Sequence, residues 1–413
     1  MTAEPLAPPQ ASSGRAAWVR ANLFSSWANS LVTVLLGVAL IIIGLLVIDW
    51  ALRARWGVIT TNLRQFLIGF YPLDQAWRVW LTLAMFSALA GLTGGYHRRG
   101  PIRTLAVWFG VGQGLLAGLA AVAAFEAIAV TGRPERFGEM LVITASLLVN
   151  AAIVVATMLL AALRRTPRTP LALAWLASVP ASLILLQGIG IGGLDLVPTS
   201  TWGGLMLTFL LAVVGIALSF PIGVLLALGR RSDLPAMRWL STAYIEIVRG
   251  VPLVTLLFMA AVMVPLFLPG EVRIEHVYRA MAGITLFSAA YVAENVRGGL
   301  QAIPSGQIEA AHAIGLNTIQ TNVFIVLPQA LRSVIPANVG LFISLLKDTT
   351  LVAIAGTGLL ELLGVGQSVL AQTQWTGAQL EVYVFISVVF FVLCYTMSQA
   401  SYRLEEALGV GKR

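Results

Sequence analysis

Long uninterrupted apolar runs, each near 20 residues, constrain this chain more than any other feature of its sequence. The hydrocarbon core of a bilayer is about 30 Å thick, and a helix of roughly 20 apolar residues crosses it. Because lipid offers the backbone no hydrogen-bond partners, only helices or closed barrels satisfy its polar groups there. The runs do not alternate as barrel strands do, so they predict an all-α polytopic membrane protein.

Ten such runs predict about ten transmembrane helices. Their approximate limits are 30–50, 78–96, 105–129, 140–163, 171–191, 203–228, 250–269, 279–299, 333–356 and 382–402. Composition agrees, because 58% of the residues are hydrophobic and only 11% are charged, against about 25% charged in soluble domains. This balance excludes a soluble enzyme and a disordered scaffold.

Basic residues in the connections predict the orientation of the chain. With the N-terminus inside, 17 of the 26 lysines and arginines fall in cytoplasmic segments, 8 fall in outer segments, and Lys347 lies inside a span. Because cytoplasmic loops carry the excess of Lys and Arg, both termini are expected in the cytoplasm and the span count is expected to be even. The basic residues that give the chain its net charge of +8 lie between the apolar runs. They are not gathered on one soluble face, so they do not indicate nucleic-acid binding.

Composition divides the chain into three parts. Residues 1–26 are rich in Pro, Ala and Ser and predict a flexible cytoplasmic tail. Residues 27–200 contain five spans with few polar residues and predict an N-terminal membrane extension. Residues 201–413 contain nearly every polar motif and predict the functional core. The run 30–50 is too long for the apolar part of a signal peptide and lacks a cleavage site, so it is expected to remain as an anchor.

Motifs of catalysis and nucleotide binding are missing from the sequence. The two lysines, Lys347 and Lys412, lie outside any Gly-Lys-[Ser/Thr] phosphate loop. The three histidines, His97, His276 and His312, are far apart and form no metal-ligand motif. We therefore expect no catalytic residue, metal site or bound cofactor in this chain. Energy for an active process must come from another protein.

A connection of roughly 30 residues, 300–332, separates the eighth and ninth predicted spans, and connections of this length seldom lack structure. Ser305 is expected to cap a helix, Glu309 to lie near its positive dipole end, and Gly315 to end it in the left-handed conformation. The pattern predicts a short cytoplasmic helix at about 306–314. Periodicity alone leaves this helix as a simple link between two spans.

The residue spacing in this connection resembles the EAA signature of the permease subunits of ABC importers. The matching positions are Glu309, Ala310, Ala311, Gly315, Ile325, Leu327 and Pro328. In that family the short helix docks in a groove of the ATPase subunit and passes on its closure. The resemblance therefore implies ATPase coupling for Glu309, Ala310, Ala311, Gly315, Leu327 and Pro328. Pro328 is also expected to stop the apolar stretch before it.

This resemblance covers about residues 200–410 and implies a type I ABC importer permease core in the C-terminal half. Segments such as Arg249-Gly250-Val251-Pro252-Leu253 and Lys347-Asp348-Thr349 are similar to the polar amino acid branch. The whole chain, with its five extra spans, resembles the longer permease of general L-amino acid importers. The resemblance implies a second permease subunit, two ATPase subunits that bind ATP and Mg, a periplasmic amino acid binding protein, an L-amino acid substrate and a bacterial inner membrane.

Polar residues within the predicted spans suggest a substrate path, because a charge there costs about 2.5–3.5 kcal/mol on insertion scales. The candidates are Tyr291, Glu294, Arg297, Lys347, Asp348 and Thr349, of which the last three lie near the middle of the ninth span. In one interpretation, Lys347 or Arg297 faces the carboxylate of a zwitterion. Glu294 or Asp348 then faces its ammonium. In the other, Glu294 and Arg297 form an i,i+3 pair at the inner surface, while Lys347 and Asp348 hold helices together.

A further polar group, Glu246, Arg249, Gly250 and Pro252, is compatible with a bending gate or with a plain amphipathic helix.

We expect a multi-pass permease subunit of an ATP-driven importer of L-amino acids, in which ATPase closure drives alternating access. The alternative is a self-sufficient ion-coupled secondary amino acid transporter, which inverted repeats would favour. The two halves of this sequence match poorly, which argues against that alternative.

Overall fold

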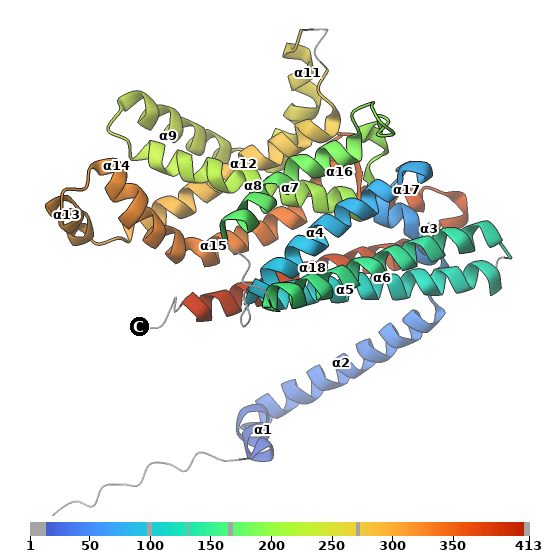
Figure 1. Ribbon diagram of the computed structural model, residues 1–413. Helices are drawn as coiled ribbons and strands as arrows, with labels where there is room; N and C mark the ends of the chain where they lie inside the picture. The colour runs from blue at the N-terminus through green and yellow to red at the C-terminus, as the bar shows by residue number, and fades with distance from the viewer. Residues whose placement is uncertain (1–13, 97–100, 130–131, 164–167, 270–272, 409–413) are drawn as a thin grey trace, which may run out of the picture. The chain divides into compact units, whose positions relative to one another are not determined.

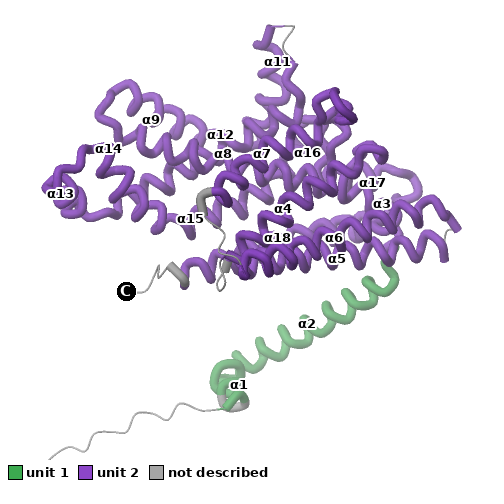
Figure 2. The backbone as a smooth tube through the Cα atoms, in the orientation of Figure 1, with its two compact units in different colours: residues 1–55 green, residues 56–413 purple. Residues whose placement is uncertain are grey.

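A computed structural model describes residues 14–96, 101–129, 132–163, 168–269 and 273–408 of the chain. It has two compact units, residues 1–55 and residues 56–413 (Figure 2). Some of the sequence predictions concern positions outside the described residues: residues 1–13, His97, Lys412 and the arginines of the loops at 97–100 and 164–167.

The described residues of the first unit, 14–55, form two helices. Helix α1, Arg15–Leu23, lies within the segment that composition predicted as a tail. Helix α2, Trp27–Arg53, contains the first predicted span, and Ser26 caps it by accepting a hydrogen bond of 3.2 Å from the Asn29 backbone N–H. No residue of α2 is buried within the structure. A helix that is apolar on every side and 27 residues long has the composition and length of a membrane anchor.

The second unit begins with the helices that follow the anchor. They are α3 (Gly57–Ile68), η1 (Leu73–Gln75), α4 (Trp77–Tyr96), α5 (Pro101–Ala129), α6 (Pro134–Leu163), α7 (Arg168–Gln187) and η2 (Thr199–Thr201). Helices α4, α5 and α6 pack against one another (Figure 1). Glycine makes the α4–α6 contact close: a Cβ on Gly91 would lie 2.4 Å from the carbonyl oxygen of Val154. Small residues at such contacts let membrane helices approach closely.

The remaining elements form the C-terminal half of this unit. They are α8 (Gly204–Arg230), α9 (Pro235–Gly250), α10 (Leu253–Phe258), the π-helix η3 (Met259–Met263), α11 (Val264–Phe267), α12 (His276–Gln301), α13 (Ser305–Ala313), α14 (Thr318–Gln320), the π-helix η4 (Thr321–Val326), α15 (Leu327–Asp348), α16 (Leu351–Ile354), β1 (Leu360–Glu361), α17 (Leu362–Leu370), η5 (Thr373–Trp375) and α18 (Gln379–Leu408). Helix α12 packs against both α8 and α15. Helices α13 and α14 lie together at one end of the unit (Figure 1).

Eight helices of the described chain are long and apolar enough to cross a membrane, or nine if one bent pair forms a span. The sequence predicted about ten. Helix α12 accounts for part of the difference: it has 26 residues, but Arg279, Glu294 and Arg297 make it less apolar than the others. The all-α polytopic fold is confirmed, with fewer strongly apolar spans than the runs suggested.

The seventh predicted span begins at a corner. Helix α9 and the segment Leu253–Phe267 meet at 104°. Pro252 disfavours a helical conformation in the residue before it, and Val251 is extended at φ −110° and ψ 135°. The segment then contains the π-helix η3, where Arg279 of α12 donates a hydrogen bond of 3.2 Å to the Ala260 carbonyl. A guanidinium thus stabilises carbonyls that the wider helix leaves less well paired.

The predicted stop at Pro328 is wrong. The chain stays helical from Thr318 to Asp348, and the π-helix η4 ends directly before α15, whose first turn contains Pro328. Proline lacks an N–H, and its ring clashes with the carbonyl four residues earlier in a regular α-helix. The wider turn before it accommodates both effects.

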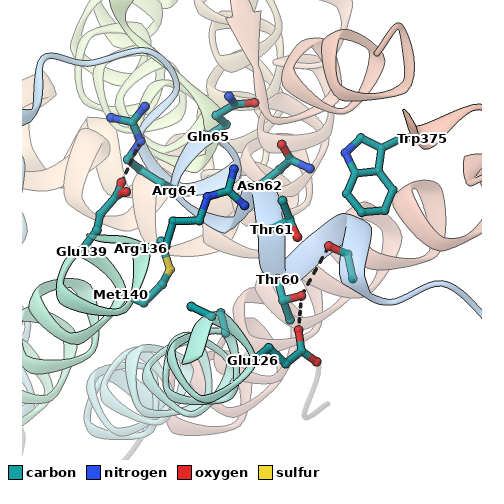
Figure 3. A pocket seen from close by; sticks show the side chains of 13 residues that line it. Thr60, Thr61, Asn62, Arg64, Gln65, Glu126, Arg136, Glu139, Met140 and Trp375 are labelled. Atoms are coloured by element: carbon teal, nitrogen blue, oxygen red, sulfur yellow. Dashed lines mark hydrogen bonds and ion pairs between the residues drawn. The ribbon is translucent and has the colours of Figure 1, made fainter. Parts of the chain in front are cut away.

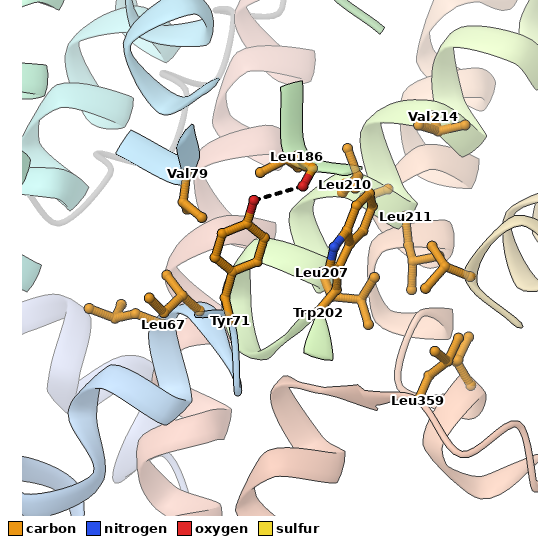
Figure 4. Close-up of a cluster of buried hydrophobic side chains, with 14 of the residues drawn as sticks. Leu67, Tyr71, Val79, Leu186, Trp202, Leu207, Leu210, Leu211, Val214 and Leu359 are labelled. Carbon is orange, nitrogen blue, oxygen red and sulfur yellow. Dashed lines mark hydrogen bonds between the residues drawn. The ribbon is translucent and has the colours of Figure 1, made fainter. Parts of the chain in front are cut away.

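Buried side chains hold the N-terminal helices against α8. Tyr71 and Trp202 are almost fully buried, and the Tyr71 hydroxyl donates a hydrogen bond of 2.7 Å to the Leu186 carbonyl (Figure 4). Burial raises the pKa of Tyr71 to about 12. Arg78, counted by sequence among the outer basic residues, is wholly buried and donates to the carbonyls of Asp195 and Gly193 at 2.7 and 3.2 Å. These contacts fix the glycine-rich loop after α7.

Candidate functional site

The predicted docking helix is present as α13, Ser305–Ala313, one residue earlier than the expected 306–314. The expected cap is wrong, since Ser305 is the first helical residue and Pro304 occupies the cap position without a side-chain hydrogen bond. Proline fixes φ near −65°, and here φ is −60° with ψ 139°, so the chain enters the helix directly from an extended residue.

Gly315 ends α13 as predicted, in the left-handed region at φ +89°. Its N–H donates to the His312 carbonyl at 2.9 Å, and the Leu316 N–H donates to the Ala311 carbonyl at 3.1 Å. This pair of bonds is the Schellman motif, which satisfies the last carbonyls of a helix. A residue with a Cβ is strained at this φ, so glycine is required for the sharp exit.

Most of α13 is exposed, including Glu309 and Ala310, while Ala311 on the opposite face is only 3% exposed. Its inner face packs on a group of buried residues that we call the α12 cluster. The members are Ala227, Ile245, Val292, Ala293, Val296, Leu300, Val326, Ala330 and Val334. Ile308 of α13 and Leu327 of α15 pack against it, whereas Pro328 is exposed. The α12 cluster therefore joins α13 to α8, α9, α12 and α15.

Large apolar side chains remain exposed around α13. Ile314 is 77% exposed, Ile319 is 74% exposed and Phe324 is 65% exposed. They belong to the turn after α13, to α14 and to η4, which are neighbours in the fold. Ile314 lies in the turn next to the polar residues Glu309 and His312 of α13, whereas Ile319 and Phe324 are at the start of the candidate span Thr318–Asp348. Exposed apolar residues gathered beside polar ones are typical of a protein interaction surface.

Five charged side chains from three helices form what we call the arginine–glutamate network. The members are Arg230 of α8, Glu246 and Arg249 of α9, and Glu294 and Arg297 of α12. Glu294 lies at its centre: it pairs with Arg297, which also donates from Nε at 2.9 Å, and its Oε2 lies 3.6 Å from Arg230 and 3.5 Å from Arg249. Glu246 pairs with Arg230 at 2.8 Å. Three guanidinium groups against two carboxylates leave one positive charge in excess.

Tyr291, one turn before Glu294 on α12, belongs to the same region. The Arg249 guanidinium lies 5.5 Å from the centroid of its ring, which is within the range of a cation–π contact. The next residue after Glu294, Asn295, donates a hydrogen bond of 3.0 Å to Asn338 and ties α12 to α15. The predicted path residues of α12 are thus brought together with the polar group on α9.

Lys347, Asp348 and Thr349 lie elsewhere in this fold. They were expected near the middle of a span, but α15 ends at Asp348 and α16 begins at Leu351. The hydroxyls of Thr349 and Thr350 donate at 2.7 Å to the carbonyls of Leu346 and Lys347, and such local bonds compete with continuation of a helix. Lys347 is exposed at the negative end of the α15 dipole, and Thr349 is fully buried.

Sequence reasoning missed that Arg230 and Arg249 are partners of Glu294. The sequence left Glu246 and Arg249 in a bending gate or a plain amphipathic helix, and only the packing of α9 against α8 and α12 brings these side chains to Glu294. Across the described residues, His, Cys, Asp and Glu side chains form no group of three placed to hold a metal ion.

Comparison with known proteins identifies the family. Residues 219–407 match the family described as binding-protein-dependent transport system inner membrane component. The inner membrane amino-acid ABC transporter permease protein YhdY of Escherichia coli is 36% identical, over 100% of this chain and 98% of that protein. The glutamate/glutamine/aspartate/asparagine transport system permease protein BztC of Rhodobacter capsulatus is 36% identical, over 98% of this chain and 97% of that protein.

Among solved structures, the crystal structure of an amino acid ABC transporter with histidines matches 49% of this chain and 92% of that chain, with 27% identity and a TM-score of 0.44. The similarity to YhdY and BztC extends over nearly the full length of both partners. The chain therefore belongs to the family of binding-protein-dependent inner membrane transport components, as an amino-acid ABC transporter permease.

Proposed function

We propose that this chain is one permease subunit of an ATP-driven importer that carries polar L-amino acids across a bacterial inner membrane. A second permease, two ATPase subunits that bind ATP and Mg, and a periplasmic amino acid binding protein complete the importer. The names of YhdY and BztC support amino acids as the cargo. A self-sufficient ion-coupled transporter has less support, because the chain belongs to a family of ABC permeases.

The observation that carries this proposal is the connection between α13 and the membrane helices. The outer face of α13 is free, with Glu309 and Ala310 exposed. Its inner face, through Ile308, contacts the α12 cluster, and three members of that cluster on α12, Val292, Ala293 and Val296, lie within two residues of Glu294. A rigid displacement of α13 by a bound ATPase would move α12 with it, because packed interiors transmit displacement with little compression.

The arginine–glutamate network supplies the response to such a displacement. It connects the end of α8, the end of α9 and α12 by ion pairs between side chains that are mostly half-buried. When these helices separate, the arginines and glutamates of the network change their ion-pair partners. The guanidinium in excess can then bind the carboxylate of a zwitterion that passes through the path. We assign Tyr291, Glu294 and Arg297 to this inner part of the path, and Lys347, Asp348 and Thr349 to a second part at the end of α15.

Retention of an ATPase by the purified protein tests the coupling proposal. The full chain, with an affinity tag, is purified in mild detergent from cells that take up amino acids through it, and ATP hydrolysis and copurified proteins are measured. The test variant is Ala310→Glu, which adds bulk and charge on the exposed face of α13. The matched control is Gln301→Glu, which adds the same charge at the exposed end of α12.

The proposal predicts that the wild type and Gln301→Glu retain an ATPase and show ATP-dependent uptake. Ala310→Glu should lose both and still insert into the membrane at normal levels. Normal ATPase retention and uptake in Ala310→Glu would refute docking at α13. Uptake by the purified chain alone in liposomes, driven by an ion gradient, would instead support a secondary transporter.

A further inference from the structure

A pocket lined by charged as well as apolar residues lies among the N-terminal helices, away from α13 and from the arginine–glutamate network. Its volume is about 320 Å³. Residues of α3, the end of α5, the start of α6 and Trp375 of η5 line it (Figure 3). The distribution of Lys and Arg among the loops predicts that the ends of α5 and α6 nearest this pocket lie on the outer side of the membrane. Pockets that bind small molecules begin at about 300 Å³, so this one has room for a single small ligand.

Four charged side chains line the pocket and give it both signs of charge. Glu139 forms an ion pair of 3.0 Å with Arg64. Glu126 accepts a hydrogen bond of 2.6 Å from the Thr60 hydroxyl through one of its two oxygens. Arg136 has neither a hydrogen bond nor an ion pair among the described residues, and its side chain extends into the pocket (Figure 3). The pocket therefore offers one available guanidinium and one carboxylate with capacity for a further donor.

Two buried polar atoms at the pocket lack partners as well. They are the Oε1 of Gln65 and the Nε1 of Trp375. A buried polar atom without a hydrogen bond costs about 1–3 kcal/mol, and natural structures satisfy nearly all such atoms. The acceptor on Gln65 and the donor on Trp375 are complementary to a ligand that carries both kinds of group.

The balance of charge selects the class of ligand. Arg64, Arg136, Glu126 and Glu139 sum to zero net charge, so a dianion such as free phosphate would meet two carboxylates as well as two guanidinium groups. A zwitterion, which has an anionic group and an ammonium a few bonds apart, matches both signs. The Trp375 ring provides apolar contact for the rest of such a molecule, and Met140 lies on the opposite side of the pocket, near Glu139 (Figure 3).

We propose that this pocket is a second amino acid site, in the N-terminal extension, that binds a free α-amino acid zwitterion. Arg136 binds the α-carboxylate, Glu126 accepts from the α-ammonium, and the side chain of the ligand lies against Trp375. The site is separate from the transport path proposed above and does not depend on ATPase docking. A phosphatidylethanolamine headgroup has the same pairing of charges, so the experiment must distinguish the two sources.

The experiment uses the full chain in nanodiscs of phosphatidylcholine, which has no primary ammonium. A mixture of ¹³C-labelled protein amino acids is equilibrated across a dialysis membrane, and retained amino acids are identified by mass spectrometry. The site is then located with photo-methionine, an α-amino acid with a diazirine side chain, followed by peptide mapping. Arg136→Gln and Glu126→Gln are the test variants, and Arg136→Lys keeps the charge. Arg133→Gln is the matched control, because Arg133 is exposed directly before α6, three residues from Arg136, and does not line the pocket.

The proposal predicts label on peptides that contain Trp375 or residues 57–65, and a decrease in affinity of about tenfold or more in Arg136→Gln and Glu126→Gln. Arg133→Gln should bind as the wild type does, and Arg136→Lys should retain part of the affinity. Label only on α12 or α15, or equal binding by Arg136→Gln and Arg133→Gln, would overturn the proposal. Copurified phosphatidylethanolamine that is lost in Arg136→Gln, without amino acid binding, would overturn it in favour of a lipid ligand.

Discussion

Gly299 of α12 sets how closely α12 and α15 approach each other. A Cβ at this position would lie 2.5 Å from Val334 Cγ1 and 2.8 Å from the Ala330 carbonyl oxygen. Carbon atoms in good contact are about 3.5–4.0 Å apart, so α15 would have to move by about 1 Å. Val334 and Ala330 belong to the α12 cluster, which leaves little room for that movement. Overpacking of this kind costs about 1–3 kcal/mol.

The neighbouring residue, Gly298, is a matched control. A Cβ on Gly298 meets no atom within 4 Å, so Gly298→Ala should leave the free energy of unfolding unchanged or raise it by up to about 1 kcal/mol through helix propensity. Gly299→Ala should lower it by about 1–3 kcal/mol. Reversible unfolding in mixed detergent and dodecyl sulfate micelles, followed by tryptophan fluorescence, measures both variants. Equal unfolding midpoints for the two variants would refute the close α12–α15 contact.

Three further predictions concern the turn after α13, the arginine–glutamate network and a buried carboxyl. Gly315→Ala should cost about 1–2 kcal/mol of local strain at φ +89° and reduce ATP-driven uptake; Gly306→Ala, in open space without a positive φ, is the control, and equal uptake by both contradicts the role of this turn. Glu294→Gln should lower the free energy of unfolding by about 1–2 kcal/mol because three arginines lose a partner. Glu246→Gln, more exposed and with one partner, should lose less, so a larger loss in Glu246→Gln counts against Glu294 as the centre. Burial raises the pKa of Glu361, which lies outside the candidate spans. The stability that this carboxyl contributes is therefore complete below the ordinary carboxyl range and is lost as pH rises through the raised pKa. The melting temperature should fall across that pH window, and the same fall with pH in Glu361→Gln would show that this carboxyl is not responsible.

Sequence alone predicted the helical membrane fold, the family and the position of α13 to within one residue. The fold follows from the length of the apolar runs, and the end of α13 follows from Gly315, whose positive φ strains any residue with a Cβ. The same local reasoning was wrong at two positions: it made Ser305 the cap of α13 and not its first residue, and it stopped a helix at Pro328. The chain has an extended proline before α13 and a π-helix before α15. Side-chain preferences do not reveal either of these backbone arrangements.

Tertiary structure alone decided which distant residues meet. Glu294 was visible in the sequence, but its pairing with Arg230 and Arg249 depends on the corner after α9 and on α8–α12 packing. The pocket around Arg136 depends likewise on α3 lying against the ends of α5 and α6. Helix formation is governed by interactions within four residues, so a sequence read in short windows reveals its helices. Contacts between helices depend on packing over the whole unit, and no window along the chain contains that information.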